Sequence, residues 1–367
     1  MTAETADSAS KTPSHRRVVL ITGCSSGGIG HHLALEFALR GFTVYASARN
    51  PTKIDTALAA RGVTSIQMDV TCQDSVDEAV TRVLREAGCI DILVNNAGQM
   101  CVGPVVEVPV DRAQALFNVN VMGVSRVCRA VAPHMMDRRK GVVVNVGSVS
   151  GYMTTPWVGY YAASKAALHT MSDALRMELE PFDVKVVVVA PGSVKSHLVD
   201  AQRNNRLLED GSRYSLAEDA VQARAELSQR EAPMDTELFA RKMVDRVLEK
   251  NPSTYITFGG NAFVAWVAYF VPPGWRDFYL ARRFGTSKLK ADLKDADKPR
   301  VGGACPVSHS IGGRCPVGNR QGGSFLTRCP VTNPAAWAVA AGAFALYYVY
   351  KHPDVLERVL RLVKNVI

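Results

Sequence analysis

The sequence predicts an α/β fold in which a doubly wound parallel sheet carries helices on both faces. Short apolar runs alternate with helical patterns from residue 17 to about residue 260, an alternation typical of parallel strands joined by crossover helices. A glycine-rich turn at residues 23–30 stands between the first apolar run and the first helical pattern, where such folds bind a phosphate group. We therefore expect a Rossmann-type, dinucleotide-binding catalytic domain over residues 17–260.

The strands and helices of this domain follow in a regular order. The first strand is expected at residues 17–22 and the first helix at residues 30–40. Runs rich in valine and isoleucine predict parallel strands that are buried on both faces. The later elements are expected as strand 43–46, helix 74–87, strand 90–94, strand 142–146 and strand 184–190.

Length and composition limit the remaining possibilities. The 367 residues suffice for one large core with appendages, and the polar residues 1–16 predict a disordered lead rather than a signal peptide. Eight cysteines without small-domain spacing predict reduced thiols. The formal net charge of +9 suits an acidic ligand or an anionic membrane surface. Because no nucleic-acid motif accompanies that charge, no nucleic-acid partner is expected.

A catalytic group is expected just after the strand at residues 142–146. Tyr161 and Lys165 are four residues apart in a helical pattern and share one face, and Ser148 at the strand end can reach the same point. A lysine ammonium about 4 Å away stabilises a phenolate by roughly 4 kcal/mol at an effective dielectric of about 20, which lowers the phenol pKa by roughly three units. We therefore expect Tyr161 to act as general acid/base while Ser148 holds the reacting oxygen.

The motifs resemble, in order and spacing, those of the short-chain dehydrogenase/reductase superfamily over residues 15–260. They are TGCSSGGIG at residues 22–30, NNAG at residues 95–98, Asn120, Ser148, Tyr161, Lys165 and Pro191-Gly192. The resemblance implies hydride transfer between a nicotinamide cofactor and a ketone, with Lys165 also on the nicotinamide ribose and Asn120 supporting a water path to Lys165. It places the cofactor against Gly23, Ser25, Gly28, Ile29, Gly30, Arg49, Asp69, Asn96, Ala97, Tyr161, Lys165, Pro191, Gly192 and Val194.

The glycine turn contains one residue more than the family pattern TGxxxGxG. Gly23, Gly28 and Gly30 can still fill the three glycine roles, and either Ser26 or Gly27 is the insertion. The sequence leaves the choice between them open.

Cofactor choice depends on the end of the second strand. A carboxylate there would bind the ribose hydroxyls of NAD, whereas an arginine accommodates the additional phosphate of NADP. This chain has Ser47-Ala48-Arg49 and no acid, so we expect NADP(H), with Arg49 on the 2′-phosphate. A solvated arginine in a turn is the alternative.

A polar helical segment with several arginines follows at residues 193–234. Arginines in this position could hold an anionic head group of the substrate, but a salt-bridged, solvent-exposed face is the favoured interpretation. The arginines are Arg203, Arg206, Arg213, Arg224 and Arg230.

The pattern around residues 96–99, 181–182 and 257–272 resembles more specifically the fungal 1-acyldihydroxyacetone-phosphate reductases. That resemblance implies NADPH-dependent reduction of a lipid-like ketone to lysophosphatidate. It also implies a place on the endoplasmic reticulum membrane or a lipid droplet, with the catalytic domain facing the cytosol. Retinal and ketosteroids are alternative substrates, because dehydrogenases acting on them share most of these motifs.

Residues 261–285 are expected to form an apolar interfacial segment. Residues 262–271 (AFVAWVAYFV) are too few to span a bilayer but suit a segment lying in its interface. A buried helix of the catalytic domain is the competing interpretation.

Residues 286–333 are predicted to be a linker that holds three Cys-Pro-Val repeats. Their cysteines are Cys305, Cys315 and Cys329, and the uneven spacing argues against a zinc site, so no metal is expected. A low-complexity tether is favoured; haem ligation near His309 and palmitoylation of Cys329 are alternatives.

Residues 334–367 are predicted to be membrane-anchoring helices. Asn333-Pro334 is a helix start, residues 335–350 are uncharged, and residues 354–367 are amphipathic and basic. A soluble helical hairpin packed on the domain is the alternative. The function predicted for the whole chain is a membrane-associated NADPH-dependent carbonyl reductase, with homo-oligomerisation left open. The competing class is a non-catalytic membrane adaptor that binds haem or a partner.

Overall fold

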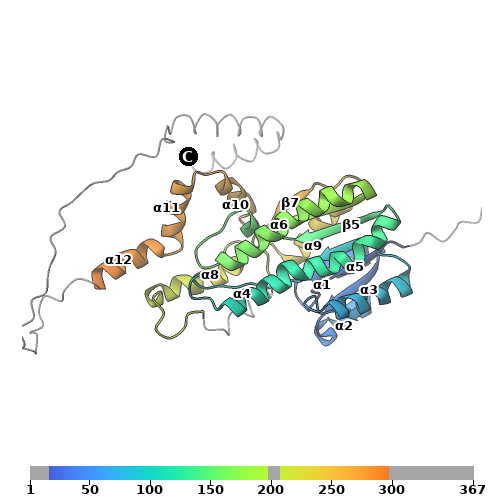
Figure 1. The fold of residues 1–367 in the computed structure, drawn as a ribbon, viewed down its shortest axis with the longest axis horizontal. Coiled ribbons are helices and arrows are strands. Elements are labelled where there is room, and N and C mark those ends of the chain that lie inside the picture. Colours follow the sequence, from blue (N-terminus) through green and yellow to red (C-terminus); the bar gives the residue numbers. More distant parts are fainter. Residues whose placement is uncertain (1–15, 197–206, 297–367) are drawn as a thin grey trace, which may run out of the picture. The chain divides into compact units, whose positions relative to one another are not determined.

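The structure, a computed structural model, describes residues 16–196 and 207–296. Seven parallel strands form one sheet in the order β3-β2-β1-β4-β5-β6-β7, which confirms the predicted Rossmann-type sheet (Figure 1). The strands are β1 (Val18–Ile21), β2 (Thr43–Ala48), β3 (Thr64–Gln67), β4 (Ile92–Asn95), β5 (Gly141–Val146), β6 (Val184–Pro191) and β7 (Tyr255–Phe258). The ends of the strands and helices predicted within residues 17–260 lie within two residues of the observed ends.

The central strands are buried on both faces, as their valine-rich sequences require. In β5 and β6 the pairs Val143↔Val186 and Val144↔Val187 alternate between the two sides of the sheet. All four residues are 4% exposed or less. Such strands have no polar face, so helices must cover both sides.

Two groups of helices provide that cover. On one face lie α1 (Ile29–Leu39), the short α2 (Thr56–Ala59) and α9 (Thr236–Val247), which bury Phe37 and Phe239 against the sheet. On the other face lie α3 (Gln73–Ala87), α5 (Val124–Asp137) and α6 (Gly159–Leu179), with Val80, Val127 and Leu168 in the core.

A third apolar cluster lies beyond the sheet. It joins the loop before α6 to α8 (Glu218–Arg230), α11 (Pro273–Arg283) and α12 (Thr286–Ala296) through Trp157, Val221, Phe284 and Leu289. The Trp157 indole donates a hydrogen bond to the Phe284 carbonyl oxygen at 2.9 Å. The described residues after 260 therefore belong to the same compact unit as the sheet, which reaches past the expected end of the domain at residue 260. Helix α12 occupies the first residues of the segment expected to be a linker.

Two further helices border the same region, α4 (Val110–Phe117) and α10 (Ala262–Tyr269). Helix α10 is the apolar segment for which a buried helix was one interpretation. That interpretation is wrong, because only Ala262 is buried and Val264 is 62% exposed.

Among residues 16–196 and 207–296, no helix has the length and apolar character needed to cross a membrane. Residues 1–15 of the expected lead, the Cys-Pro-Val repeats, the expected membrane-anchoring helices at 334–367, Arg203 and Arg206 lie outside the described residues.

The strand order fixes where a ligand can bind. The chain passes from β1 outward through β2 to β3, then returns to β4 on the other side of β1. The connections after β1 and β4 therefore diverge and leave a crevice at the carboxyl ends of these strands.

Candidate active site

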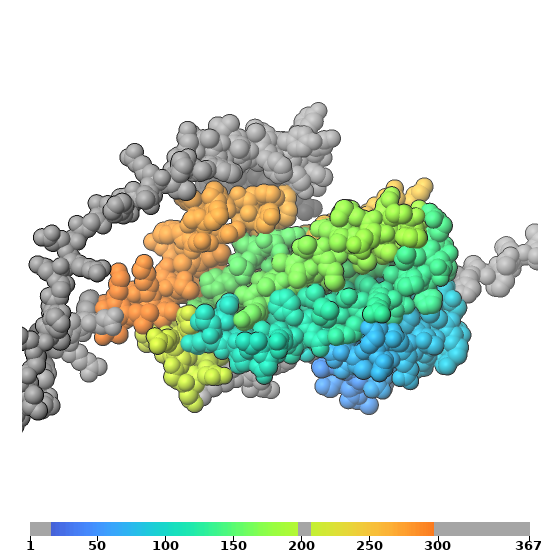
Figure 2. Space-filling model, in the orientation of Figure 1, coloured from blue at the N-terminus to red at the C-terminus, as the bar shows by residue number. Residues whose placement is uncertain are grey.

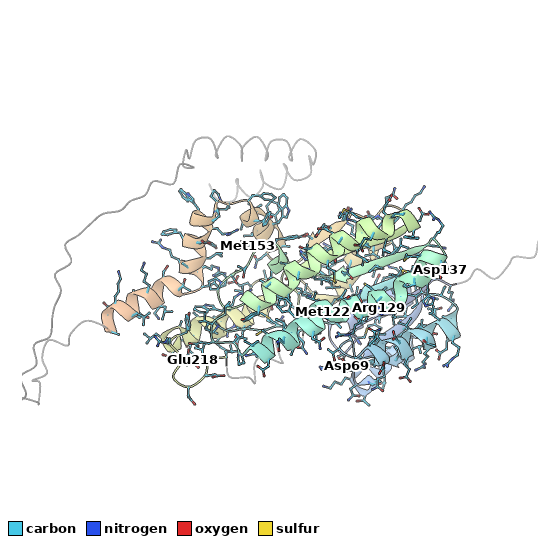
Figure 3. All side chains as sticks on the ribbon, in the orientation of Figure 1. Asp69, Met122, Arg129, Asp137, Met153 and Glu218 are labelled. Atoms are coloured by element: carbon cyan, nitrogen blue, oxygen red, sulfur yellow. The ribbon has the colours of Figure 1, made fainter. Side chains whose placement is uncertain are left out.

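A cavity of about 1010 Å³ occupies this crevice. Its wall runs from the glycine turn after β1, past the end of β3, to the segment before α6 and the helices α10 and α11. Figure 3 labels two wall residues, Asp69 and Met153, which are well separated in the view. A cavity of this volume, lined both by the glycine turn and by α10 and α11, has room for distinct cofactor and substrate ends.

Ser148, Tyr161 and Lys165 come together on one wall of this cavity. Ser148 follows β5 and caps the short turn Val149–Gly151, where its Oγ accepts a hydrogen bond from the Ser150 amide at 3.1 Å. Tyr161 and Lys165 project from the first turns of α6, and the Ser148 hydroxyl is hydrogen-bonded to that of Tyr161. The Lys165 Nζ donates to the Val146 carbonyl oxygen at 2.8 Å, which fixes the lysine beneath the strand end.

The electrostatics of this group differ from the expectation. Burial raises the pKa of Tyr161, opposed by the Ser148 hydrogen bond and the positive charge of Arg224. Burial also lowers the pKa of Lys165 to about 8. The expected lowering of the Tyr161 pKa by Lys165 is therefore not found in this structure, because desolvation of the phenolate is the largest effect on it.

Asn120 is buried next to this group but does not line the cavity. It lies in a π-helical turn, Asn118–Gly123, between α4 and α5. Its side chain binds both backbone groups of Gln99, at 2.8 and 2.9 Å, and donates to the Ser164 hydroxyl at 3.0 Å. Asn120 therefore ties the segment after β4 to α6.

The glycine turn shows how the additional residue is accommodated. Gly28 donates to the Ser25 carbonyl oxygen, and Gly27, with φ of +71°, occupies a left-handed position between them. Ser25, Ser26 and Gly28 line the cavity whereas Gly27 does not, which favours Gly27 as the insertion.

Gly30 and Asn96 hold this turn against the end of β4. A Cβ at Gly30 would lie 2.5 Å from the Gly23 carbonyl oxygen, so the helix packs too closely for any side chain. The side-chain amide of Asn96 donates through Nδ2 to the backbone carbonyl oxygens of Thr22 and Gly23 at 2.9 and 3.0 Å. Gly30 therefore has a packing role, while Gly23, Gly28, Ile29, Asn96 and Ala97 line the cavity.

Two cations and one carboxylate border the cavity beyond β2 and β3. Arg49 is exposed at the end of β2, and Lys53, which the sequence analysis missed, lines the same wall. Burial raises the pKa of Asp69, but Thr71 hydrogen bonds and the charge of Arg49 outweigh it and lower the value overall. Lys53 ends the short 3-10 turn Pro51–Lys53, and its closeness in sequence to Arg49 was the only local signal for it.

The segment after β6 closes the cavity floor. Pro191, Gly192 and Val194 line it, and Ser193 bridges to Gly260. A Cβ at Gly192 would lie 2.2 Å from the Gly260 carbonyl oxygen, so this crossing requires glycine.

The arginines after β6 have different environments. Arg213 is exposed, and Arg230 is exposed and paired with Glu226, as a solvent face predicts. Arg224 is only 7% exposed and lines the cavity, so the solvent-face interpretation is wrong for this residue.

Comparisons with known proteins agree with this geometry. The short chain dehydrogenase family matches residues 17–207. The short-chain dehydrogenase ptmH of Penicillium ochrochloron is 36% identical over 275 residues, 74% of this chain and 99% of that protein. The NADPH-dependent 1-acyldihydroxyacetone phosphate reductase of Schizosaccharomyces pombe is 40% identical over 50% of this chain and 61% of that protein. A short-chain dehydrogenase from Streptomyces avermitilis superposes with a TM-score of 0.61 at 28% identity, over 77% of this chain and 99% of that one.

The chain therefore belongs to the short-chain dehydrogenase family of oxidoreductases, which confirms the resemblance drawn from its motifs. Members of this family use NAD(P) and act on alcohol or keto groups.

Proposed function

We propose that the protein reduces the keto group of a lipid-like substrate, with Tyr161 as proton donor. The convergence of Tyr161, Ser148 and Lys165 on one cavity wall supports this proposal. Ser148 donates a hydrogen bond that positions the carbonyl oxygen, and Tyr161 gives that oxygen its proton. Lys165 holds a positive charge beside the phenol and contacts the nicotinamide ribose. When bound, the cofactor supplies the hydride that completes the alcohol.

The cavity wall fits a dinucleotide. The closely packed glycine turn and the amide groups after β1 suit a pyrophosphate, and Asp69 lines the same cavity at the end where the adenine would lie. Pro191, Gly192 and Val194 lie at the nicotinamide end.

NADPH is the cofactor that this wall favours. Arg49 and Lys53 both border the cavity where the adenosine ribose would lie, and both can bind its 2′-phosphate. No carboxylate stands at the end of β2, in the sequence Ser47-Ala48-Arg49, to bind the ribose hydroxyls instead.

The best-supported substrate is 1-acyldihydroxyacetone phosphate, reduced to lysophosphatidate. The relative from Schizosaccharomyces pombe supports it, as does an apolar cavity wall that includes Val264, Ala268 and Val271. Retinal and ketosteroids are the alternative ketones.

The surface formed by α10 and α11 supports a location at the endoplasmic reticulum or a lipid droplet. These helices also form the cavity wall, so a lipid entering from a membrane would meet the cavity directly. Trp275, Phe278 and Tyr279 are 78%, 58% and 60% exposed, beside Arg276 and Arg282. Exposed aromatic residues with neighbouring arginines are typical of an interface with anionic lipids.

Tyr161→Phe tests the proposed mechanism. It removes only the hydroxyl, so NADPH-dependent turnover should fall by at least about 100-fold while NADPH binding persists. Tyr160→Phe is the matched control, because Tyr160 is the adjacent residue and does not line the cavity. Equal turnover in Tyr161→Phe and the parent protein would disprove the mechanism.

A further inference from the structure

Arg224 stands out among the residues of the cavity because its guanidinium is buried. It extends from α8, donates through Nε to the Thr155 hydroxyl at 2.8 Å, and lies 5.7 Å from the centre of the Phe284 ring. Thr155 and Phe284 also line the cavity, so Arg224 sits between the loop before α6 and the end of α11.

This buried charge has no ion-pair partner among the described residues. The carboxylate that acts on it electrostatically is that of Glu231, which is already paired with Arg283. A guanidinium carries five N–H donors, and the Thr155 hydroxyl and the Phe284 ring engage only a small part of this hydrogen-bonding capacity. No other hydrogen bond from this guanidinium is found among the described residues, and Arg224 lines the cavity, so its remaining donors are available to an anion bound there.

The position of Arg224 relative to the catalytic group limits where that anion lies. Its charge acts on the Tyr161 hydroxyl, and burial lowers the pKa of Arg224 to about 10, still far above neutral pH. Arg224 is therefore a cation in the neighbourhood of the reacting oxygen.

We propose that Arg224 binds an anionic group of the ketone substrate, a phosphate or a carboxylate. This inference rests on the proposed reduction at Tyr161. It names an acidic ketone as the substrate class, with Arg224 as the residue that selects it. A planar guanidinium suits such a group because it binds two of its oxygens at once.

The proposed site is separate from the cation pair that would bind the cofactor. Arg49 and Lys53 follow β2, whereas Arg224 belongs to α8 and to the wall shared with Phe284 and Leu280. The cavity thus has one anion site for each reactant. The apolar wall of α10 remains for the acyl chain.

A matched pair of ketones tests the proposal in the full-length protein. With NADPH, kcat/KM is measured for 1-palmitoyl dihydroxyacetone phosphate and for 1-palmitoyl dihydroxyacetone, which differ only in the phosphate. The ratio of interest is kcat/KM for the phosphorylated ketone divided by kcat/KM for the unphosphorylated one. Arg224→Gln should lower this ratio at least about tenfold, equivalent to about 1.4 kcal/mol. Arg224→Lys should restore part of the ratio because it keeps the charge but not the planar fork.

Two further variants guard against a general structural effect. Arg230→Gln, on the same helix but exposed and outside the cavity wall, should keep the parent ratio. Thr155→Val removes the hydroxyl that orients Arg224 and should lower the ratio without altering the charge. A ratio that stays unchanged in both Arg224→Gln and Thr155→Val overturns the proposal.

Calorimetric binding of glycerol 3-phosphate, with NADP⁺ saturating, separates this inference from the proposed reaction. Binding that weakens at least about tenfold in Arg224→Gln supports the anion site even if the parent protein reduces neither ketone, a result that would contradict only the reaction. Equal binding by the parent protein and Arg224→Gln overturns the anion site even if both ketones are reduced.

Discussion

Arg49 and Lys53 are the side chains that we propose to set cofactor choice. Both lie where the second strand ends, and neither is part of the catalytic group. Their proposed ligand, a ribose phosphate, is the only group by which NADPH differs from NADH. A measurement of the preference for NADPH over NADH therefore tests the proposed roles of Arg49 and Lys53 and not those of the catalytic group.

We predict at least a tenfold preference for NADPH over NADH in the parent protein, about 1.4 kcal/mol. Arg49→Ala should remove most of this preference, because we assign its guanidinium as the main partner of the additional phosphate. Steady-state kcat/KM values for the two cofactors measure it.

Arg61→Ala is the control, since Arg61 is exposed and does not border the cavity. Equal kinetic constants for the two cofactors in the parent protein would contradict the assignment of Arg49.

The sequence predicted that Ser148, Tyr161 and Lys165 lie together, which the structure confirms, but it did not predict the whole cavity around them. Tyr161 and Lys165 share one helix, so their spacing alone predicted their proximity. Arg224 contacts Thr155 and Phe284, residues 69 and 60 positions away, and no local pattern indicates contacts of that kind. The pKa of Tyr161 was also beyond the sequence, because it depends on the burial of the phenol.

At the scale of secondary-structure elements, His169 connects α6 to the loop that carries Ser148. The Ser148 amide donates to its Nε2 at 3.4 Å, and its ring packs against Tyr152 and Tyr255. A Cβ at Gly147 would lie 2.1 Å from the same Nε2, so the loop can pass only because that residue is glycine. Burial lowers the pKa of His169 to about 4, assisted by the charge of Lys165 and opposed by Asp173.

This lowered pKa predicts a loss of stability in mild acid. Unfolded histidine has a pKa of about 6.5, so between that value and about 4 the unfolded chain binds a proton that the folded chain does not. The contribution of His169 to the free energy of unfolding is complete above about pH 6.5. It is lost as the pH falls, and the loss is roughly 3 kcal/mol at about pH 4. Denaturant unfolding at a series of pH values gives the free energy of unfolding as a function of pH. Between about pH 6.5 and 4 this free energy should fall less steeply with decreasing pH in His169→Gln than in the parent protein.

His134→Gln provides the comparison, because His134 is exposed at the end of α5. If His169→Gln and His134→Gln have the same pH dependence, the buried ring is not responsible for the slope.

At the scale of the whole molecule, the order of elements was predictable because β-branched runs and helices alternate without interruption. The strands β3 and β7 received no predicted bounds, since short edge strands such as Thr64–Gln67 keep polar, partly exposed residues. The packing of α11 and α12 on Trp157 could not be foreseen either. It joins segments more than 120 residues apart through a few apolar contacts.

The α10–α11 surface leads to a prediction for the full-length protein. Figure 2 shows the atoms of these helices, in orange, at the molecular surface. The double variant Trp275→Ser and Phe278→Ser should bind vesicles of phosphatidylcholine and phosphatidylserine at least about tenfold more weakly, because each aromatic side chain contributes about 1.5–3 kcal/mol when buried. Flotation measures the bound fraction.

Met177→Ser replaces another exposed apolar residue, 62% exposed on α6, and should leave vesicle binding unchanged. Equal flotation of the double variant and the parent protein would mean that residues 273–283 are not a membrane-binding surface.

The hydrogen bond between the Trp157 indole and the Phe284 carbonyl oxygen has a consequence for how such a protein can change over evolution. The sheet and its glycine turn form one end of the cavity, and residues 262–289 complete the other end through that bond and the cluster around it. Exchange of this carboxyl-terminal segment would therefore change the lining of one end of the cavity while the sheet and its glycine turn stay as they are.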